Sequence, residues 1–173
     1  MGPTRPGDRV LDVDCGPGCL TNLVADAVRP AGTALGIDPS PTVIDHAKRS
    51  TKRENCSFEL GTAEHLAAPD NMLDVVLSSL MVNHLRVDLR PRAFAEVLRV
   101  LHPGGRLLIA DIRPPTSRLG RHLVGVATGL EMQDNSIHLL EPLVPAAGFE
   151  VLSRGDLHPN LDYSEGRRPN AGH

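Results

Sequence analysis

Aromatic residues are scarce in this chain of 173 residues, which has no tryptophan, one tyrosine and three phenylalanines. A flat ligand would therefore find few rings to stack on. Cysteine is also rare, and three residues, Cys15, Cys19 and Cys56, cannot build a disulfide framework. The eight histidines never take a His-x-x-x-His spacing, so the sequence predicts no metal site of the zinc type.

Long apolar runs and long basic runs are missing as well. No stretch approaches the roughly 20 apolar residues of a membrane-spanning helix, and no positive segment followed by an apolar one opens the chain. No basic run is longer than the pairs Lys48-Arg49 and Lys52-Arg53, and the net charge is −3, so we expect no nucleic-acid partner. These absences predict a cytoplasmic protein with a single core.

The most informative segment is a short apolar run, residues 10–13, that meets Asp14 and opens into a turn with Gly16 and Gly18. Glycines let the backbone approach a ligand closely. Residues 19–29 then carry apolar side chains at helical spacing. The strand, the glycine turn and the start of the helix thus meet at one point. This arrangement predicts a binding loop, because N–H groups at the start of a helix bind anionic oxygens.

An acid follows at the spacing that a nucleotide-type cofactor requires. Residues 33–38 form a second strand that ends in Asp38, 20 positions beyond Gly18. Parallel-sheet cofactor folds place an acid for the ribose hydroxyls there. A nicotinamide site competes, but Thr21 stands where its Gly-x-Gly-x-x-Gly pattern needs a third glycine, so this alternative is disfavoured. Asp38 could instead serve the start of the next helix, although Ser40 and Pro41 already suit that role.

Strand and helix patterns alternate along the rest of the chain. They predict a three-layer α/β fold with a Rossmann-like, mostly parallel sheet of seven strands and helices on both faces. Too few apolar residues follow His158 to define the last strand, and we expect a disordered tail at residues 166–173. A C-terminal helix should be short or kinked because prolines interrupt it. The expected elements are strands at 56–60 and 72–80, a turn followed by a fifth strand within 102–111, a helix from Pro91, a helix within 136–148 and a strand from Phe149.

These segments together resemble the class I S-adenosylmethionine-dependent methyltransferases, in the small-molecule branch typified by the quinone-biosynthesis methyltransferases. The resemblance covers residues 5–155 and rests on the acid and Gly-x-Gly pattern of residues 12–18, on Gly61-Thr62-Ala63-Glu64, and on Pro103-Gly104-Gly105. It implies one methyltransferase domain over residues 1–165 and methyl transfer to an oxygen or carbon atom of a small organic acceptor. The family's Asn/Asp-Pro-Pro-Tyr signature for nitrogen acceptors is absent after the fourth strand.

The resemblance also implies which residues bind S-adenosylmethionine. The amino-acid end of the cofactor would meet Asp12 and the backbone N–H groups around Gly16 and Gly18. Asp38 would hold the ribose, and the segment Thr62–Glu64 would border the adenine. Asp12 could instead cap the following turn, and Ser78 and Ser79 could serve only the packing of the fourth strand. His84 is a candidate general base, because its unperturbed pKa is near neutral. The expected cofactor residues are Asp12, Asp14, Cys15, Gly16, Pro17, Gly18, Asp38, Pro39, Thr62, Ala63, Glu64, Ser78 and Ser79.

Three features depart from the family pattern. Asp14 replaces the first loop glycine, where its carboxylate could repel that of the cofactor, and Thr62 replaces an acid that many relatives turn toward the adenine. The chain begins nine residues before the first strand, whereas relatives carry lid helices upstream. Either a homodimer or a partner subunit supplies the lid, or the pocket stays open, or the sequence begins inside a longer protein. Residues 116–135 lack clean periodicity and are expected to be a mobile acceptor-side region.

The alternative function is a non-catalytic S-adenosylmethionine-binding or interaction protein.

Overall fold

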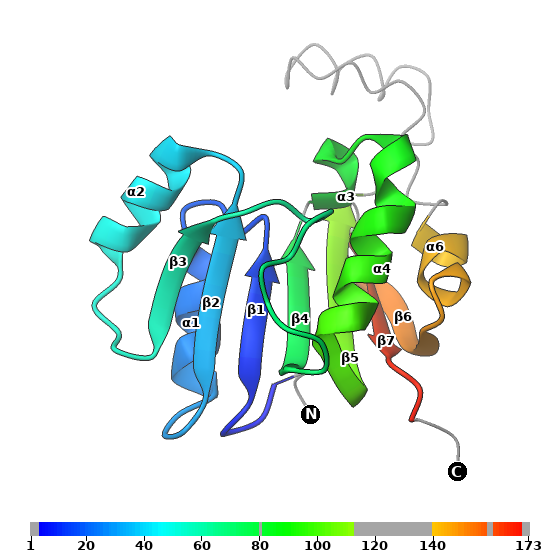
Figure 1. Cartoon of the computed structure of the whole chain (residues 1–173), viewed down its shortest axis with the longest axis horizontal. Helices are drawn as coiled ribbons and strands as arrows, with labels where there is room; N and C mark the ends of the chain where they lie inside the picture. Colours follow the sequence, from blue (N-terminus) through cyan, green and yellow to red (C-terminus); the bar gives the residue numbers. More distant parts are fainter. Residues whose placement is uncertain (1–3, 80, 113–139, 159–160, 171–173) are drawn as a thin grey trace.

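A computed structural model describes residues 4–79, 81–112, 140–158 and 161–170 (Figure 1). Its strands are β1 (Arg9–Val13), β2 (Thr33–Asp38), β3 (Cys56–Leu60), β4 (Leu73–Ser79), β5 (Leu101–Ile112), β6 (Glu150–His158) and β7 (Leu161–Arg167). Its helices are α1 (Cys19–Ala27), α2 (Pro41–Ser50), α3 (Met81–His84), α4 (Arg90–Val100) and α6 (Leu140–Ala146), with a 3₁₀ turn at Val87–Leu89.

The strands form one seven-stranded sheet in the order β3-β2-β1-β4-β5-β7-β6. Neighbours from β3 to β5 are parallel, and β7 runs antiparallel to both β5 and β6. The mostly parallel, three-layer α/β fold predicted from the sequence is thus confirmed. The chain leaves β1 toward one edge of the sheet and β4 toward the other, so a crevice opens at their carboxyl ends, where such sheets bind ligands.

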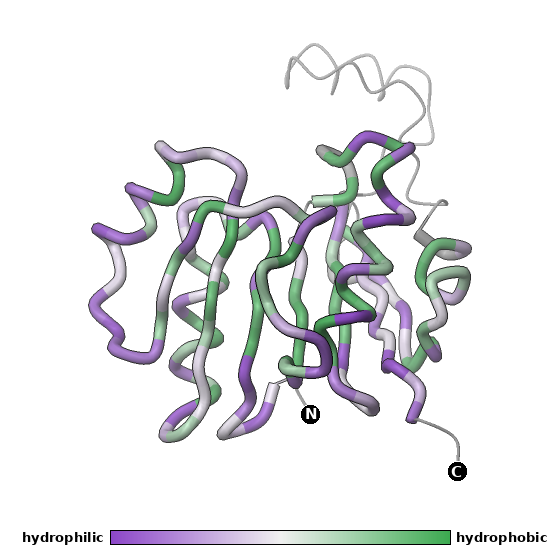
Figure 2. Tube along the Cα trace, viewed as in Figure 1, coloured by the Kyte–Doolittle hydropathy of each residue, from purple (hydrophilic) through white to green (hydrophobic). Residues whose placement is uncertain are grey.

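Alternate residues of the central strands supply two cores, one on each face of the sheet. Val10 and Val75 belong to the cluster that α1 and α2 cover, whereas Leu11 and Val76 belong to the cluster that α4 and α6 cover. In Figure 2 hydrophobic residues follow the central strands, while α2 and α4 alternate between hydrophobic and hydrophilic residues. Period-two burial in the strands and one-sided burial in the helices therefore hold the three layers together.

Local signals at the helix starts explain where the two helices near the crevice begin. Gly18 precedes α1 with φ 83°, a left-handed conformation that suits glycine. The Ser40 hydroxyl accepts a hydrogen bond from the Val43 N–H at 3.5 Å, and Pro41 opens α2, as predicted.

None of the described helices is long and apolar enough to cross a membrane.

The Pro103-Gly104-Gly105 segment is a bulge inside β5 rather than a turn before it. Leu73 pairs with Leu101 and Val75 pairs with Arg106, so β5 has more residues than β4 between the two pairs, which is the pattern of a β-bulge. Gly104 takes φ 83° there, which explains the glycine. The expected fifth strand is therefore confirmed, and it begins earlier than its apolar residues indicate.

The C-terminal region corrects one expectation. Residues 161–167 form β7, and the Arg168 N–H donates to the Gly105 carbonyl at 2.8 Å, so the disordered tail predicted from residue 166 is wrong as far as Asn170. Neighbouring strands on both sides satisfy the β7 backbone, and its buried residues include Ser164 and Gly166, so no apolar pattern marks it. The helix α6 is short, as predicted. The segment 116–135 lies outside the described residues.

Candidate functional site

The loop between β1 and α1 has three residues in the left-handed region of backbone space. Asp14 has φ 62°, Gly16 has φ 54° and Gly18 has φ 83°. A Cβ on Gly16 would meet nothing within 4 Å, whereas a Cβ on Gly18 would lie 2.5 Å from Phe58. Gly16 thus borders open space and Gly18 is packed against the sheet. Asp14 adopts the conformation of the glycine that it replaces, which aspartate tolerates better than most residues.

Hydrogen bonds fix this loop to the end of β2. The Cys15 N–H donates to the Ile37 carbonyl at 2.9 Å, and the Gly18 N–H donates to the Cys15 carbonyl at 3.1 Å. The Gly16 N–H donates to one carboxylate oxygen of Asp38 at 3.1 Å. The N–H groups of Gly16 and Gly18 thus have partners inside the protein, and the binding of the cofactor carboxylate by N–H groups around these glycines stays a prediction.

Asp38 ends β2 with its carboxylate between two backbone donors. One oxygen accepts from Gly16 as described, and the other accepts from the Ser40 N–H at 2.9 Å. The residue is buried yet lines a cavity. A carboxylate offers about four acceptor positions. Asp38 therefore joins the loop to the start of α2 and retains acceptor capacity for a ligand.

Asp12 is buried on the α1 side of β1 and accepts a hydrogen bond from the Thr21 hydroxyl at 2.6 Å. Burial raises the pKa of Asp12 to about 6, the hydrogen bond from Thr21 opposes this rise, and the charge of Asp14 adds to it. The same surroundings act on Cys15. Burial, with the carboxylates of Asp12 and Asp38, raises the pKa of that thiol to about 12, so Cys15 is no nucleophile near neutral pH.

A cavity of about 560 Å³ opens between the loop and the end of β2. This volume falls within the roughly 300–1,000 Å³ of small-molecule sites. Cys19 and Leu20, at the start of α1, also border it. The expected cofactor residues that line it are Asp12, Asp14, Cys15, Gly16, Pro17, Asp38, Pro39 and Ser79.

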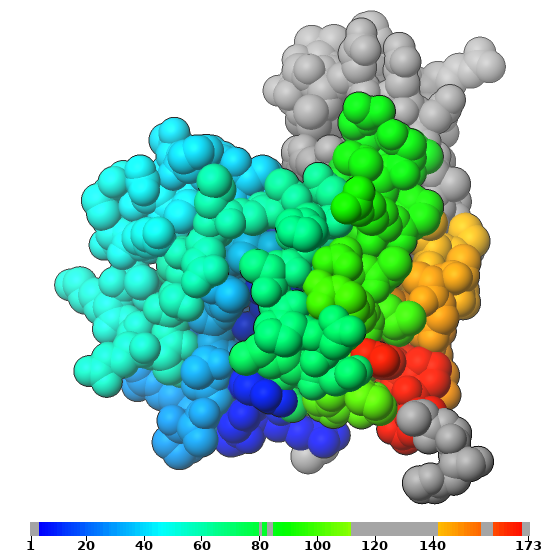
Figure 3. All heavy atoms as spheres, in the orientation of Figure 1, coloured from blue at the N-terminus to red at the C-terminus, as the bar shows by residue number. Residues whose placement is uncertain are grey.

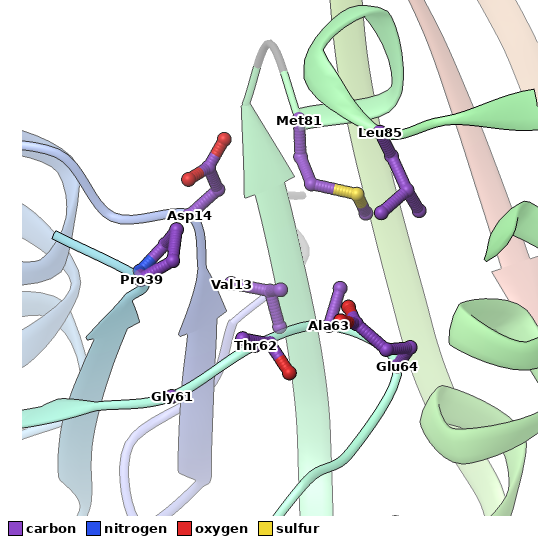
Figure 4. Close-up of a pocket in the computed structure, with 9 residues that line it drawn as sticks. All are labelled: Val13, Asp14, Pro39, Gly61, Thr62, Ala63, Glu64, Met81 and Leu85. Atoms are coloured by element: carbon purple, nitrogen blue, oxygen red, sulfur yellow. The ribbon is translucent and has the colours of Figure 1, made fainter.

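A second cavity, of about 180 Å³, adjoins the first and shares Asp14 and Pro39 with it. Thr62, Ala63 and Glu64 form one side of this cavity. Figure 4 shows the side chains of Met81 and Leu85 opposite this segment. Apolar groups facing a polar segment suit a flat heterocycle. The two cavities together run from the glycine loop to the segment after β3.

Residues 61–72 cross the face of the sheet that carries α4. Figure 1 shows this segment passing in front of the central strands, and in Figure 3 its atoms occupy the middle of the same face. Glu96 and Arg99 of α4 hold this segment. Glu96 accepts from the Leu66 N–H at 2.9 Å, and Arg99 donates to the carbonyls of Leu66 at 2.8 Å and Ala68 at 3.0 Å. Arg99 also pairs with Asp70 at 2.6 Å. The Arg99 guanidinium lowers the pKa of Glu96 to about 2, so this contact is charged at neutral pH.

Gly18 and Ser78 are not among the described residues that line the two cavities. Gly18 is buried behind the loop, and Ser78 is buried within β4, with no hydrogen-bond partner for its hydroxyl among the described residues. His84 is the last residue of α3, directly after the carboxyl end of β4, and its side chain lies outside what the structure describes. Its role as a base stays a prediction.

Sequence reasoning missed several contributors to the site, among them Thr21, Met81, Leu85 and Arg99. In the sequence Thr21 only marks the absence of a third glycine, whereas in the structure its hydroxyl donates a hydrogen bond to Asp12. Met81 and Leu85 follow β4 at i and i+4, a helical spacing that could have marked one apolar face. Arg99 carried no local signal, because the segment it holds lies about 30 residues away in sequence.

Comparisons with known proteins agree on the class. Residues 10–105 match the family described as methyltransferase domain. A demethylmenaquinone methyltransferase from Symbiobacterium thermophilum is 38% identical over 122 residues, which cover 68% of this chain and 47% of that protein. The chain spans less than half the length of several curated relatives, this one among them.

Solved structures share the fold. A methyltransferase in complex with the Trm112 methyltransferase activator, from Haloferax volcanii, matches with a TM-score of 0.82 at 20% identity, covering 99% of this chain and 86% of that chain. A SAM dependent methyltransferase from Aquifex aeolicus matches with a TM-score of 0.78 at 17% identity, covering 94% and 83%. The fold and the family match together define a methyltransferase domain of the Rossmann-like type.

This chain belongs to the class I S-adenosylmethionine-dependent methyltransferase family and is similar to its quinone-biosynthesis branch. S-adenosylmethionine is the cofactor of the family, and the residues present fit it. Gly16 borders space that a Cβ would enter, Asp38 retains acceptor positions, and the two joined cavities provide room for an elongated ligand.

Proposed function

We propose that this protein transfers a methyl group from S-adenosylmethionine to an oxygen or carbon atom of a small organic acceptor. The observation that carries the proposal is the pair of joined cavities at the carboxyl ends of β1 and β2, with the Asp38 carboxylate in its wall. Parallel sheets bind ligands at this edge. Membership of the methyltransferase family supports the assignment.

Each end of the cofactor has a matching group in this chain. The first N–H groups of α1 have no partner within the helix, and Cys19 and Leu20 border the larger cavity, so we assign the cofactor carboxylate to their N–H groups. Asp38 accepts the ribose hydroxyls. The segment Thr62–Glu64 borders the adenine, with the Ala63 N–H as its donor and Met81 opposite.

When bound, the cofactor supplies a methyl group that the acceptor's oxygen or carbon takes as the carbon–sulfur bond breaks, its electron pair staying on sulfur and the acceptor's proton leaving. The protein's part is to hold the acceptor in line and to exclude water, which contributes roughly 7 to 11 kcal/mol to such reactions. His84 is the candidate base for an acceptor hydroxyl. His84→Gln is expected to lower the rate with phenols more than with phenolates already ionised in solution.

The experiment is methyl transfer from S-adenosylmethionine with a labelled methyl group to a panel of phenols and reduced quinones. Labelled acceptor is expected with at least one of them, and the label should fall with Asp38→Ala but not with Asp45→Asn, an exposed carboxylate on α2. Absence of label in every acceptor, with cofactor bound, would contradict the proposed transfer.

That result would favour the second candidate, a non-catalytic protein that binds S-adenosylmethionine. Asp14 motivates it, because a carboxylate in the loop changes the charge of the site. The two candidates differ only in turnover, since both require binding of the cofactor.

We also propose that a second copy or a partner subunit covers the acceptor side. The Haloferax volcanii structure, a complex of a methyltransferase with an activator, supports a partner for proteins of this fold. Sedimentation of the purified chain is expected to show a dimer, or a monomer whose methyl transfer rises when a partner is added. A monomer with full activity would contradict the proposal.

A further inference from the structure

The two joined cavities carry charge of one sign. Asp12, Asp14 and Asp38 line the larger cavity, and Asp14 and Glu64 line the smaller one. No lysine, arginine or histidine is among the lining residues in the described part of the chain. The interior of the site is therefore acidic, and a ligand's net charge must affect how tightly it binds.

Asp14 has the central position among these acids. It lines both cavities, at the junction that any ligand reaching from the glycine loop to Thr62 must pass. Figure 4 shows its carboxylate above Pro39, across the cavity from Met81. The half-buried side chain sits where the family pattern has glycine, so its charge is an addition of this chain to the common site.

The other two acids of the larger cavity take part in hydrogen bonds that connect the elements around it. Asp38 accepts two backbone N–H groups, and Asp12 accepts the Thr21 hydroxyl. The charge of Asp14 also reaches the cavity interior, because it contributes to the raised pKa of the buried Asp12 carboxyl. Because it lines both cavities, Asp14 is the acid best placed to act on a ligand's charge.

We infer that the Asp14 carboxylate makes this site selective for a cationic adenosyl ligand over its neutral counterpart. S-adenosylmethionine carries a sulfonium cation that the demethylated product, S-adenosylhomocysteine, lacks. The inference rests on the proposed function and deepens it. Attraction between opposite charges is several-fold stronger in a partly buried site than in bulk water. An acidic site therefore retains the methyl donor and releases the spent product.

The amino-acid carboxylate of the ligand does not alter this conclusion. Both ligands carry the same carboxylate and the same ammonium group, so any repulsion from Asp14 at that end weakens both alike. The ratio of the two dissociation constants cancels this repulsion and isolates the effect of the sulfonium. Selectivity, rather than affinity, is thus the quantity that reports on Asp14.

The test is calorimetric titration of the wild type, Asp14→Asn and Asp14→Gly with S-adenosylmethionine and S-adenosylhomocysteine at low and high salt. Asp14→Asn keeps the size of the side chain and removes its charge. The wild type is expected to prefer S-adenosylmethionine by about fivefold or more at low salt, and the preference should fall with salt and in both variants. Asp45→Asn, which removes an exposed carboxylate, should leave the preference unchanged.

The outcomes separate this inference from the proposed function. An unchanged ratio in Asp14→Asn, with both ligands still bound, would overturn the inference alone. Equal tightening of both ligands in that variant would likewise overturn it, because it would show that Asp14 acts only by repelling the shared carboxylate. Failure of the wild type to bind either ligand would overturn the proposed function together with the inference.

Discussion

In and around the β1–α1 loop, the glycines set the backbone conformation and the aspartates set the charge. Gly16 and Gly18 both take positive φ, but only Gly18 is packed so closely that a Cβ would collide with Phe58. Asp12 and Asp38 are held by hydrogen bonds from Thr21 and from backbone N–H groups. The glycines were predictable from the sequence, whereas the Thr21 partner was not, because it depends on how α1 packs against β1.

Substituting Gly18 should mainly lower stability, whereas substituting Gly16 should mainly weaken cofactor binding. Gly18→Ala combines positive φ with the collision at Phe58, so it is expected to lower the free energy of unfolding by about 2 to 4 kcal/mol. Gly16→Ala meets open space, so it should cost about 1 kcal/mol of stability while its methyl group enters the cofactor cavity and weakens binding. Urea unfolding and calorimetric titration check the pair. Equal losses of stability, with binding by Gly16→Ala intact, would contradict this assignment.

Asp12 predicts a pH dependence of stability. Its pKa is raised from 3.8 to about 6 by folding, so the folded state holds a proton that the unfolded state loses between these values. The contribution of Asp12 to stability is therefore highest below about pH 4 and falls as pH rises to 6, by about 3 kcal/mol at 1.4 kcal/mol per pH unit. Asp12→Asn should remove this loss, so its advantage over the wild type should grow from pH 4 to pH 7.

The measurement is urea unfolding of both proteins across that pH range. Asp45→Asn, an exposed carboxylate on α2, serves as the control and should show no such growth. A constant difference between Asp12→Asn and the wild type would show that Asp12 is not buried as a proton-binding group.

Whole elements were the part of the fold best predicted from sequence. The bounds of β2 and β3 follow directly from their apolar patterns, and α1 ends within two residues of its expected end. The connection between β3 and β4 could not be predicted in this way. Residues 61–72, all described, form no helix, and their position depends on Glu96 and Arg99 of α4. Long-range contacts of this kind leave no periodic signal.

Removing Arg99 should release this connection. Arg99→Ala deletes the hydrogen bonds to Leu66, Ala68 and Asp70 and leaves Glu96 without its ion-pair partner, so it is expected to lower stability by about 2 kcal/mol. Amide hydrogen exchange at Leu66 should accelerate, and binding of S-adenosylhomocysteine should weaken because Thr62–Glu64 loses its support. Arg92→Ala, on an exposed position of the same helix, is the control. Unchanged exchange at Leu66 would contradict the role of Arg99.

At the scale of the whole molecule, the sheet order places the site and the last strand completes the sheet. The switch between β1 and β4 was predictable once the order of strands and helices was known. β7 was not, because Ser164 and Gly166 are buried there in place of large apolar residues. Its stability comes from backbone pairing with β5 and β6 and from the Arg168 guanidinium, which donates to the Leu98 carbonyl at 2.9 Å.

Truncation tests this part of the fold. A chain ending at Glu165 loses the pairing of Gly166 and Arg167 and the contacts of Arg168, and it is expected to lose about 3 kcal/mol of stability or more. A chain ending at Asn170 should unfold like the full chain. Thermal unfolding of the three proteins decides the point, and equal midpoints would mean that the end of β7 contributes nothing.

The measurement that tests the central claim most directly is calorimetric titration of the wild type and Asp38→Ala with S-adenosylhomocysteine, which needs no acceptor. We expect micromolar binding by the wild type and weakening by about tenfold or more, or about 1.4 kcal/mol, in the variant, because the ribose hydroxyls lose their acceptor. Asp38→Asn, which keeps one acceptor oxygen, should fall between them. No binding by the wild type, or equal affinity in Asp38→Ala, would contradict the cofactor site described above.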